Sequence, residues 1–356
     1  MTPIAVGILG ATGTVGQSYA RLLADHPWFD LCFMTASKES AGMRYGDALA
    51  ERHGTLSRGV ARFADRILAD PDDVAEAKGR CRFLFSALPG NVVKAYEELY
   101  ARNDLPVISN NSRYRGDEDV PLLIPEVNAD HAEVIHLQRK RRGWKRGCIV
   151  TKPNCSLQSY VLPLTPLHRT FTVVRLCVTT LQAVSGAGSS QSSSLDMEGD
   201  IIPYIPSEEE KSENEPLKVW GRVGKRGIVR ERGIAVSAHC NRVPVRDGHL
   251  ACVSVAFVRK PERGEVLDLW RTFRGPPQTL ALPSAPDDPI VYVEGLDRPR
   301  PRYDKDRGRG MSVTVGRLRS CPLFDYRFTA LSHNVIRGAA GGGILTAEYL
   351  VAKEYI

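Results

Sequence analysis

A glycine triplet near the start of the chain, Gly10-x-x-Gly13-x-x-Gly16, constrains the fold more than any other feature. It follows an apolar run at residues 3–9 and precedes the helical pattern QSYARLLADH. Glycines at this spacing allow a tight turn from strand to helix and let the backbone approach a pyrophosphate, which the helix N-terminus attracts. The triplet alone would also fit an ordinary tight turn. At the start of a strand–helix–strand unit it predicts dinucleotide binding.

The apolar segments predict two sheets of different kinds. After the first strand, strand-like runs recur with helical segments between them, at residues 29–36, 81–88 and 106–110. This alternation predicts right-handed βαβ units and a parallel sheet. From about residue 170 the runs become longer and β-branched, at residues 172–185, 233–245, 249–258 and 310–318. Short turns such as residues 246–248 favour a largely antiparallel second sheet.

The predicted fold class is therefore α/β, and the length of 356 residues suits two domains. We expect a Rossmann-like parallel-sheet domain at residues 1–150, on which a C-terminal helix within 333–356 packs back. Residues 151–332 should form a catalytic α+β domain that contains the largely antiparallel sheet. With 42% hydrophobic and 25% charged residues, the composition is that of a globular protein.

Targeting signals and cysteine spacing indicate the cellular compartment and whether a metal is bound. No charged leader, long apolar segment or cleavage site is visible near the start, so we expect a cytoplasmic protein without a signal peptide or membrane span. Eight cysteines are present without a CxxC pair, so no zinc or other metal is expected. Most of these thiols should be reduced and buried.

The net charge of +7 is concentrated in two places. Residues 139–146 hold six cations in eight positions, and residues 298–309 hold six more. With Trp144 as a stacking residue, the first cluster could bind nucleic acid. We favour a solvated helix end and a surface loop, and a positive field also suits a phosphorylated substrate and cofactor. No nucleic-acid partner is therefore expected.

The end of the second strand indicates the cofactor. NAD-specific sites usually carry Asp or Glu there to hold the ribose 2′-hydroxyl. In this chain the strand runs into Ser37 and Lys38, which could hold a 2′-phosphate. We therefore predict NADP, although Glu39 keeps NAD open.

Cys155 is the candidate nucleophile. It precedes the helical pattern SLQSYVLPL, with Asn154 as a candidate N-cap residue and Lys152 close in sequence. A thiol in the first turn of a helix gains from the helix dipole, which favours the thiolate. The alternative is a buried structural cysteine.

His249 and Arg242 are candidate partners of the thiol. They flank the turn VPVRDG, so both could project from one corner of the second sheet. Arg242 offers a bidentate clamp for a carboxylate, and a histidine can titrate near neutrality. His249 could instead be a surface turn residue, and His239 competes with it. The run Glu208-Glu-Glu-Lys211 would usually be a solvated surface.

These motifs together resemble the aspartate-semialdehyde dehydrogenase family, in its archaeal and fungal-like branch. The resemblance runs nearly end to end, through GATGTVG, SNNSRYR, VPLLIPEVN, KPNCS, QAVSGAG, IIPYIPSEEEK, CNRVPVRDGH, DRPRPRYDKDRGRGMSVTVGR and SHNVIRGAAG. It implies that Cys155 is the nucleophile, His249 the general acid/base and Gln182 the residue that orients the acyl group. Arg242 would bind the α-carboxylate and Glu208 the amine. Lys211 and Arg115 would bind the phosphate. The positions that match the family's NADP contacts are Thr12, Gly13, Thr14, Val15, Ser37, Ser40, Gly186 and Asn334. Together with Gly10, Lys38 and Ser86 they make up the predicted cofactor site.

The implied reaction is NADP-dependent interconversion of L-aspartyl 4-phosphate with L-aspartate 4-semialdehyde and phosphate, through a thioester on Cys155. It belongs to lysine, threonine and methionine biosynthesis. The resemblance also implies that residues 151–332 mediate dimerisation, so a homodimer or a homotetramer is expected.

The chain departs from the family pattern at three places. Met43 replaces a basic residue, and Ser189-Ser190-Gln191 replaces Tyr-Pro-Gly. The basic segment at 139–146 resembles reductases that act on acyl-CoA thioesters. A malonyl-CoA-type reductase on the same fold is therefore the alternative, although the Pro-Asn-Cys setting and Glu208 with Lys211 favour the amino-acid substrate. A non-catalytic NADP- or RNA-binding protein is the alternative from another class, which the complete set of catalytic residues disfavours.

Overall fold

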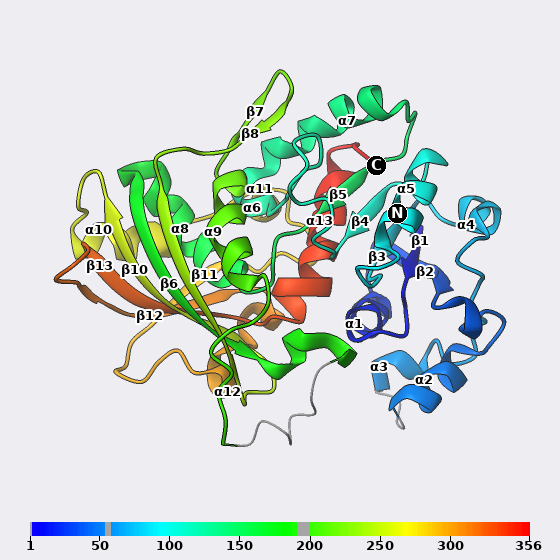
Figure 1. Cartoon of the computed structure of the whole chain (residues 1–356), viewed down its shortest axis with the longest axis horizontal. Helices are drawn as coiled ribbons and strands as arrows, with labels where there is room; N and C mark the ends of the chain where they lie inside the picture. Colours follow the sequence, from blue (N-terminus) through cyan, green and yellow to red (C-terminus); the bar gives the residue numbers. More distant parts are fainter. Residues whose placement is uncertain (1, 54–57, 191–198) are drawn as a thin grey trace.

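The computed structural model describes residues 2–53, 58–190 and 199–356. Two sheets lie next to each other along the long axis of the molecule (Figure 1). The first has five strands in the order β2-β1-β3-β4-β5, and all its pairings are parallel. Its strands are β1 (Ile4–Leu9), β2 (Phe29–Thr35), β3 (Phe83–Ser86), β4 (Val107–Ser109) and β5 (Ile149–Thr151). The predicted parallel sheet is confirmed.

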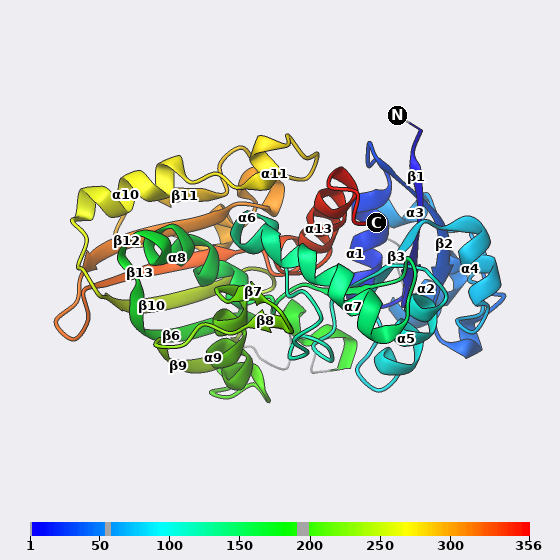
Figure 2. The same ribbon diagram turned by 90° about the horizontal axis from the view of Figure 1, so that it is seen from above.

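Helices cover both faces of this sheet. Helix α1 (Thr14–Leu23) and the C-terminal helix α13 (Gly341–Ala352) share one core with β1, while α4 (Val74–Arg80) and α5 (Val93–Arg102) pack on the other face. Figure 2 shows α13 beside α1. Because α13 is apolar on nearly all sides, it is stable only when buried. The end of the chain thus returns to the first sheet, although the predicted domain limits at 150 and 332 stay a prediction.

The second sheet has six strands in the order β11-β12-β13-β10-β6-β9. They are β6 (Val173–Ala183), β9 (Ala235–Val243), β10 (His249–Phe257), β11 (Ile290–Val293), β12 (Val313–Ser320) and β13 (Tyr326–Ser332). Three pairings are antiparallel, and the β6–β9 and β11–β12 pairings are parallel. The α/β class with a largely antiparallel second sheet is therefore confirmed.

Strands β9 and β10 do not form the hairpin that the turn VPVRDG suggests. Strand β6 lies between them, parallel to β9 and antiparallel to β10. Residues 244–248 therefore cross over the end of β6, which requires them to span two strand spacings of about 4.8 Å each. As a result, Gln182 on β6, Arg242 on β9 and His249 on β10 meet at one end of three neighbouring strands.

The remaining elements connect or cover the two sheets. The helices are α2 (Tyr45–His53), α3 (Arg58–Ala61), α6 (Pro125–Asn128), α7 (Val134–Arg142), α8 (Leu157–Phe171), α9 (Glu208–Val219), α10 (Arg263–Thr272), α11 (Pro276–Thr279) and α12 (Pro301–Asp304). A two-stranded ribbon is formed by β7 (Arg222–Gly224) and β8 (Gly227–Val229). Since β5 belongs to the first sheet and α8 packs on the second, residues 152–156 between them lie where the two layers meet. None of the helices in the described ranges is long and apolar enough to cross a membrane.

The basic cluster at 139–146 is largely tied to the protein itself. Arg139 donates to the carbonyl oxygens of Arg146 and Tyr355, at 2.7 and 2.8 Å. Arg142 pairs with Asp119 at 3.0 Å, and Arg141 also pairs with a nearby carboxylate. Half of the cations in this cluster therefore hold the end of α7 and the C-terminus in place, which favours a structural role for them.

Candidate active site

The loop that carries Cys155 leads into α8 but does not belong to it. The helix begins at Leu157, and Ser156 rather than Asn154 is its N-cap residue. Asn154 instead accepts hydrogen bonds from the amide and hydroxyl of Ser156, at 2.9 and 2.7 Å. Both the predicted cap and the predicted place of the thiol in the first helical turn are therefore wrong. Gly338 leaves room for the thiol, since a Cβ at that position would lie 2.8 Å from the Cβ of Cys155.

His249 lies within hydrogen-bond distance of the thiol. Its Nε2 is 3.3 Å from the Sγ of Cys155, and its Nδ1 accepts the amide N–H of Ala183 at 3.0 Å. The carbonyl oxygen of Ala183 accepts a hydrogen bond from Arg242 Nη1 at 2.8 Å. The backbone of one residue, next to Gln182, therefore fixes both the histidine and the arginine.

These contacts decide the protonation of His249. Burial, with a further effect of the Arg242 charge, lowers its pKa to about 3. Because Nδ1 accepts an N–H, the neutral ring must carry its proton on Nε2, facing the sulfur. The expectation that this histidine titrates near neutrality is therefore wrong for the free protein.

The thiol of Cys155 is likewise held in its neutral form. Burial raises its pKa, and the charge of Glu208 adds to this effect, while Lys152, Arg115 and Arg242 oppose it. The helix was expected to favour the thiolate. In the free protein desolvation outweighs the cations, because the half-buried side chain is surrounded mainly by protein atoms and lies before the helix.

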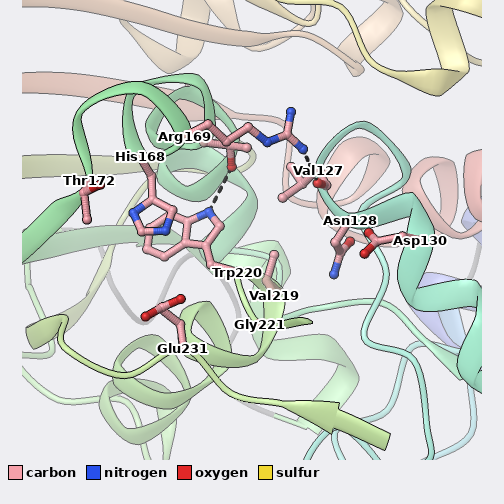
Figure 3. Close-up of a pocket in the computed structure, with 11 residues that line it drawn as sticks. Val127, Asn128, Asp130, His168, Arg169, Thr172, Val219, Trp220, Gly221 and Glu231 are labelled. Carbon is pink, nitrogen blue, oxygen red and sulfur yellow. Dashed lines mark hydrogen bonds between the residues drawn. The ribbon is translucent and has the colours of Figure 1, made fainter. Parts of the chain in front are cut away.

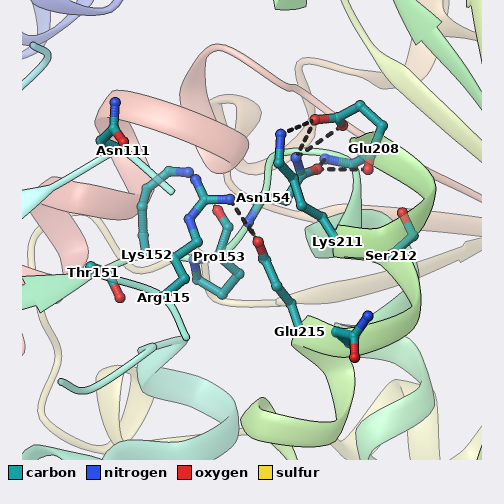
Figure 4. A network of polar contacts seen from close by, with 12 residues as sticks. Asn111, Arg115, Thr151, Lys152, Pro153, Asn154, Glu208, Lys211, Ser212 and Glu215 are labelled. Atoms are coloured by element: carbon teal, nitrogen blue, oxygen red, sulfur yellow. Dashed lines mark hydrogen bonds and ion pairs between the residues drawn. The ribbon is translucent and has the colours of Figure 1, made fainter. Parts of the chain in front are cut away.

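Charge runs usually lie on a solvated surface, but Glu208 does not. Its carboxylate is 9% exposed and accepts bonds from Asn154 Nδ2 at 2.9 Å and Gln182 Nε2 at 3.1 Å. Lys211, one turn along α9, pairs with it at 2.9 Å (Figure 4). Burial would raise the pKa of Glu208, but Lys211 and the two amides outweigh burial and hold the pKa below its usual range. Glu208 is thus a buried anion.

A second buried carboxylate lies two turns further along α9. Glu215 Oε1 pairs with Arg115 Nη1 at 2.8 Å, and its Oε2 accepts the amide N–H of Asn154 at 2.7 Å. Arg115 Nη2 donates to the carbonyl oxygen of Asn110, while the buried Nε has no partner in the part of the chain that the structure describes. Sequence reasoning missed Glu215. Its spacing of seven residues from Glu208, which places both on one helix face, was the signal available.

Lys218, on the same helix, was also missed. Its ammonium is 1% exposed and donates to three backbone carbonyl oxygens, those of Arg115, Asp117 and Val120, at 2.6–2.8 Å. These bonds use all three donors of the ammonium. The side chain therefore braces the loop that carries Arg115.

A cavity of about 740 Å³ lies at the start of α1. Seven of the predicted cofactor residues line it, namely Gly10, Thr12, Gly13, Thr14, Val15, Ser37 and Lys38. Gly10 has a φ of +80°, and a Cβ at position 16 would lie 2.2 Å from the Gly10 carbonyl oxygen. Only glycine permits this close turn, which leaves the helix N-terminus open to the cavity. The residues present therefore fit a dinucleotide.

The other four predicted cofactor residues lie elsewhere. Ser40 is buried with its hydroxyl 3.2 Å from that of Ser37, and Ser86 is buried at the end of β3. Gly186 lies against His249, where a Cβ would be 2.9 Å from Nε2. Asn334 accepts the Gly248 amide at 2.8 Å. The last two thus lie at or next to His249, while Ser40 contacts Ser37, which lines the cavity.

The residues near the expected 2′-phosphate are partly occupied by other contacts. Lys38 is exposed and forms an ion pair with Asp72, which raises the lysine pKa. Met43 packs against the core of the first sheet, so it does not face the cavity. Arg44 pairs with Asp65 at 3.2 Å. The segment that replaces the family's Tyr-Pro-Gly is only partly described. Ser189 and Ser190 belong to the short helix η3 (Val184–Ser190), and Gln191 lies outside the described residues.

A further cavity, of about 450 Å³, lies between the end of α8 and the end of α9 (Figure 3). Its main feature is the ring of His168 stacked on Trp220, with centroids 4.9 Å apart. Trp220 donates to the Thr165 hydroxyl at 3.0 Å. The cavity contains none of the predicted site residues and no cysteine, so it is separate from the thiol site.

Comparison with known proteins accounts for both parts of the chain. Residues 5–135 match the family model described as semialdehyde dehydrogenase, NAD binding domain, and residues 164–337 match its dimerisation domain. The aspartate-semialdehyde dehydrogenase of Methanothermobacter thermautotrophicus is 41% identical over 347 residues, which are 97% of this chain and 98% of that protein. This chain belongs to the aspartate-semialdehyde dehydrogenase family. The Schizosaccharomyces pombe enzyme of this name is 40% identical, with 98% of each chain covered.

Solved aspartate-semialdehyde dehydrogenases have the same fold. The Candida albicans enzyme, solved with NADP, superposes with a TM-score of 0.89 at 38% identity and covers 99% of this chain and 100% of its own. The Vibrio cholerae enzyme II, solved in complex with ASA, gives 0.75 at 26% identity over 99% of each chain. The predicted family is thus confirmed.

Proposed function

We propose that this member of the family interconverts L-aspartyl 4-phosphate and L-aspartate 4-semialdehyde with NADP as the cofactor. The observation that carries the proposal is the Cys155–His249 contact of 3.3 Å at the meeting point of three buried groups, Gln182, Glu208 and Arg242. The relatives of this name and the neighbour solved with ASA support the substrate, and the neighbour solved with NADP supports the cofactor. This activity serves lysine, threonine and methionine biosynthesis.

The charges of the site suit this substrate. Its buried or half-buried cations are Arg115, Lys152, Lys211 and Arg242, and its buried anions are Glu208 and Glu215. Four cations against two anions leave an excess of two positive charges when Lys152 is protonated and of one when it is neutral. Aspartyl phosphate has a net charge of about −2 near neutral pH, from a phosphoryl dianion, a carboxylate and an ammonium. Glu208 would take the ammonium and Arg242 the α-carboxylate, which assigns charge to charge.

In the reductive direction the sulfur of Cys155 attacks the acyl carbon. The carbon–sulfur bond forms, the bond from carbon to the phosphoryl oxygen breaks, and the thiol proton leaves with the phosphate. Gln182, which precedes the Ala183 that fixes His249 and Arg242, would orient the reacting acyl group. NADPH, when bound in the cavity at α1, supplies the hydride that reduces the thioester. Release of the aldehyde returns the electron pair to sulfur, which then regains a proton.

His249 acts in this scheme as a hydrogen-bond donor. A neutral imidazole that gave up its only proton would become an anion, which a buried site disfavours. Its Nε2–H can instead stabilise the oxyanions that precede loss of phosphate and release of the aldehyde. Neutral histidine serves as an electrophile in this way where its pKa is strongly lowered.

A pair of substitutions tests this role. His249→Asn removes the donor near sulfur and should lower kcat by about 10²–10³-fold. His249→Gln places an amide N–H, which does not titrate, near the position of Nε2 and should retain more activity. Neither variant should lose a titration near pH 6–7, because the histidine pKa is about 3. The measurement is the steady-state kcat of both variants from pH 6 to 8. If both variants are equally inactive, proton transfer by His249 is required.

The cofactor preference is tested at Lys38. We expect Lys38→Ala to raise the KM for NADP and to leave the KM for NAD unchanged, because only NADP has a 2′-phosphate. Asp72→Asn should have the opposite effect on NADP, since it frees Lys38 from its ion pair. Kinetics with both cofactors measure this. Unchanged NADP kinetics in both variants would show that 2′-phosphate recognition is not built on Lys38.

The reaction itself is tested with the purified protein, aspartate semialdehyde, phosphate and NADP, by following NADPH absorbance. We expect NADPH to form only when phosphate is present. Malonyl-CoA with NADPH is the parallel assay, and oxidation of NADPH there without phosphate dependence would favour the acyl-CoA reductase. The matched dimerisation domain supports a homodimer, and a homotetramer and the cytoplasmic location stay predictions.

A further inference from the structure

Lys152 is a buried cation that the mechanism above leaves unused. Its side chain is 3% exposed, and its ammonium donates to the Pro153 carbonyl oxygen at 2.7 Å. No carboxylate oxygen of the described residues lies within ion-pair distance of it, which is 4.0 Å. A buried ammonium without a counter-charge costs free energy, so it must lose its proton or gain an anion.

Arg115, whose charge Glu215 compensates, contributes a hydrogen-bond donor that has no partner among the described residues. One edge of its guanidinium is held by Glu215 and Asn110, while the buried Nε has no partner among the described residues. The charge of Arg115 acts directly on Lys152, and Figure 4 shows both side chains at the Thr151–Asn154 loop. An anion bound next to both side chains would offset the repulsion between them and accept a bond from the unused Nε of Arg115.

Lys211 is less available to an anion than Lys152. It is bound to Glu208 at 2.9 Å, and this ion pair already compensates its charge. We propose that Lys152, together with Arg115, binds the phosphoryl group of the acyl phosphate and takes up a proton when this dianion arrives. The proposal rests on the function proposed above and adds a residue to its phosphate site.

The protonation of Lys152 follows from the groups that face it. Burial lowers its pKa to about 7, Arg115 lowers it further, and Cys155, Glu215 and Glu208 act in the opposite direction. Near neutral pH the free protein therefore contains much neutral amine. A bound dianion favours the ammonium, so anion affinity should be full below about pH 7 and fall as the pH rises above it.

Sulfate is the probe for this test, because it remains a dianion over the whole pH range whereas phosphate itself titrates near pH 7. Sulfate binding is read as protection of Cys155 from iodoacetamide at constant ionic strength between pH 6 and 8.5. For the wild type we expect the half-protecting sulfate concentration to rise about tenfold per pH unit above the lysine pKa. An affinity that does not change with pH would overturn the proposal.

Three variants locate the titrating group. Lys152→Met should bind sulfate about 10- to 150-fold more weakly at pH 6, with no pH dependence, because one charge-assisted hydrogen bond is lost. Lys152→Arg keeps a permanent cation and should bind without pH dependence up to pH 8.5. Lys211→Met is the matched control, in which the pH dependence should persist. Wild-type behaviour of Lys152→Met, or loss of the pH dependence in Lys211→Met, would refute the assignment.

Two further measurements separate the possible failures. NADP binding and thermal unfolding report whether each variant folds. If Lys152→Met does not fold, the pH dependence of sulfate binding to the wild type and to Lys152→Arg still tests the proposal. The NADPH assay with aspartate semialdehyde and phosphate tests the proposed function independently. An inactive wild-type protein that nevertheless binds sulfate as described would refute the proposed function and leave the anion site standing.

Discussion

Replacement of Cys155 by alanine is expected to lower turnover by on the order of 10⁴–10⁶-fold, as loss of a covalent nucleophile does in other enzymes. A thioester requires this sulfur, and His249 Nε2, which lies 3.3 Å from it, carries a proton in the neutral ring and cannot attack in its place. The fold should persist because the side chain lies in a turn before α8 and only a sulfur atom is removed. Turnover is measured by NADPH formation, and NADP binding by fluorescence titration.

A matched control separates the nucleophile from cysteine loss in general. Cys252 lies on β10 but is exposed, so Cys252→Ala should leave turnover and NADP binding unchanged. More than about a hundredth of the wild-type rate in Cys155→Ala would exclude the covalent mechanism. Cys240, which is buried beside Ser212, would then need to be tested as the nucleophile.

Arg242→Lys should reduce kcat/KM by about 30- to 4000-fold, which corresponds to about 2–5 kcal/mol for a desolvated charge pair. The guanidinium is buried and uses Nη1 to bind the Ala183 carbonyl oxygen, which leaves its other N–H groups for the substrate carboxylate. A lysine ammonium has no planar pair of donors and cannot serve both partners in the same geometry. The measurement is kcat/KM for aspartate semialdehyde at saturating phosphate and NADP.

The chemistry at sulfur should be spared in this variant. Iodoacetamide should label Cys155 at a rate close to that of the wild type, because lysine keeps the positive charge near the thiol. Arg246→Lys is the control, since this arginine follows in the same connection but is almost fully exposed. If Arg242→Lys keeps the wild-type kcat/KM, the α-carboxylate is bound elsewhere and the assignment of the amino-acid substrate loses its main support.

Local sequence patterns were sufficient to predict the first sheet, the glycine turn after its first strand and the place of Cys155 next to a helix. Gly10 and Gly16 permit a turn that other residues cannot make, so their spacing predicted both the turn and the cavity beside it. The alternation of strand-like runs with helical segments in the first half predicted a parallel sheet, and that sheet is parallel. The position of Cys155 next to a helix was also predictable, although the helix starts two residues later than expected.

Contacts between distant segments were not predictable in the same way. The turn between β9 and β10 reads as a hairpin because local geometry does not show that β6 pairs with both strands. Glu208 and Glu215 occur in what looks like a solvated charge run, and only the packing of α9 against the Cys155 loop turns them inward. Sequence periodicity shows which face of a helix is polar but not what that face meets.

Residue type and near-neighbour geometry were enough to predict the parallel sheet, the dinucleotide turn and the candidate nucleophile, clamp and histidine. The ionisation of these side chains depends instead on contacts that the fold creates. The amide of Ala183 fixes the proton of His249, and burial keeps the Cys155 thiol neutral. Lys152 has no carboxylate of the described residues within ion-pair distance. The pKa of a group depends on desolvation and on charges brought close by the fold, and neither is encoded in the residues adjacent to it in sequence.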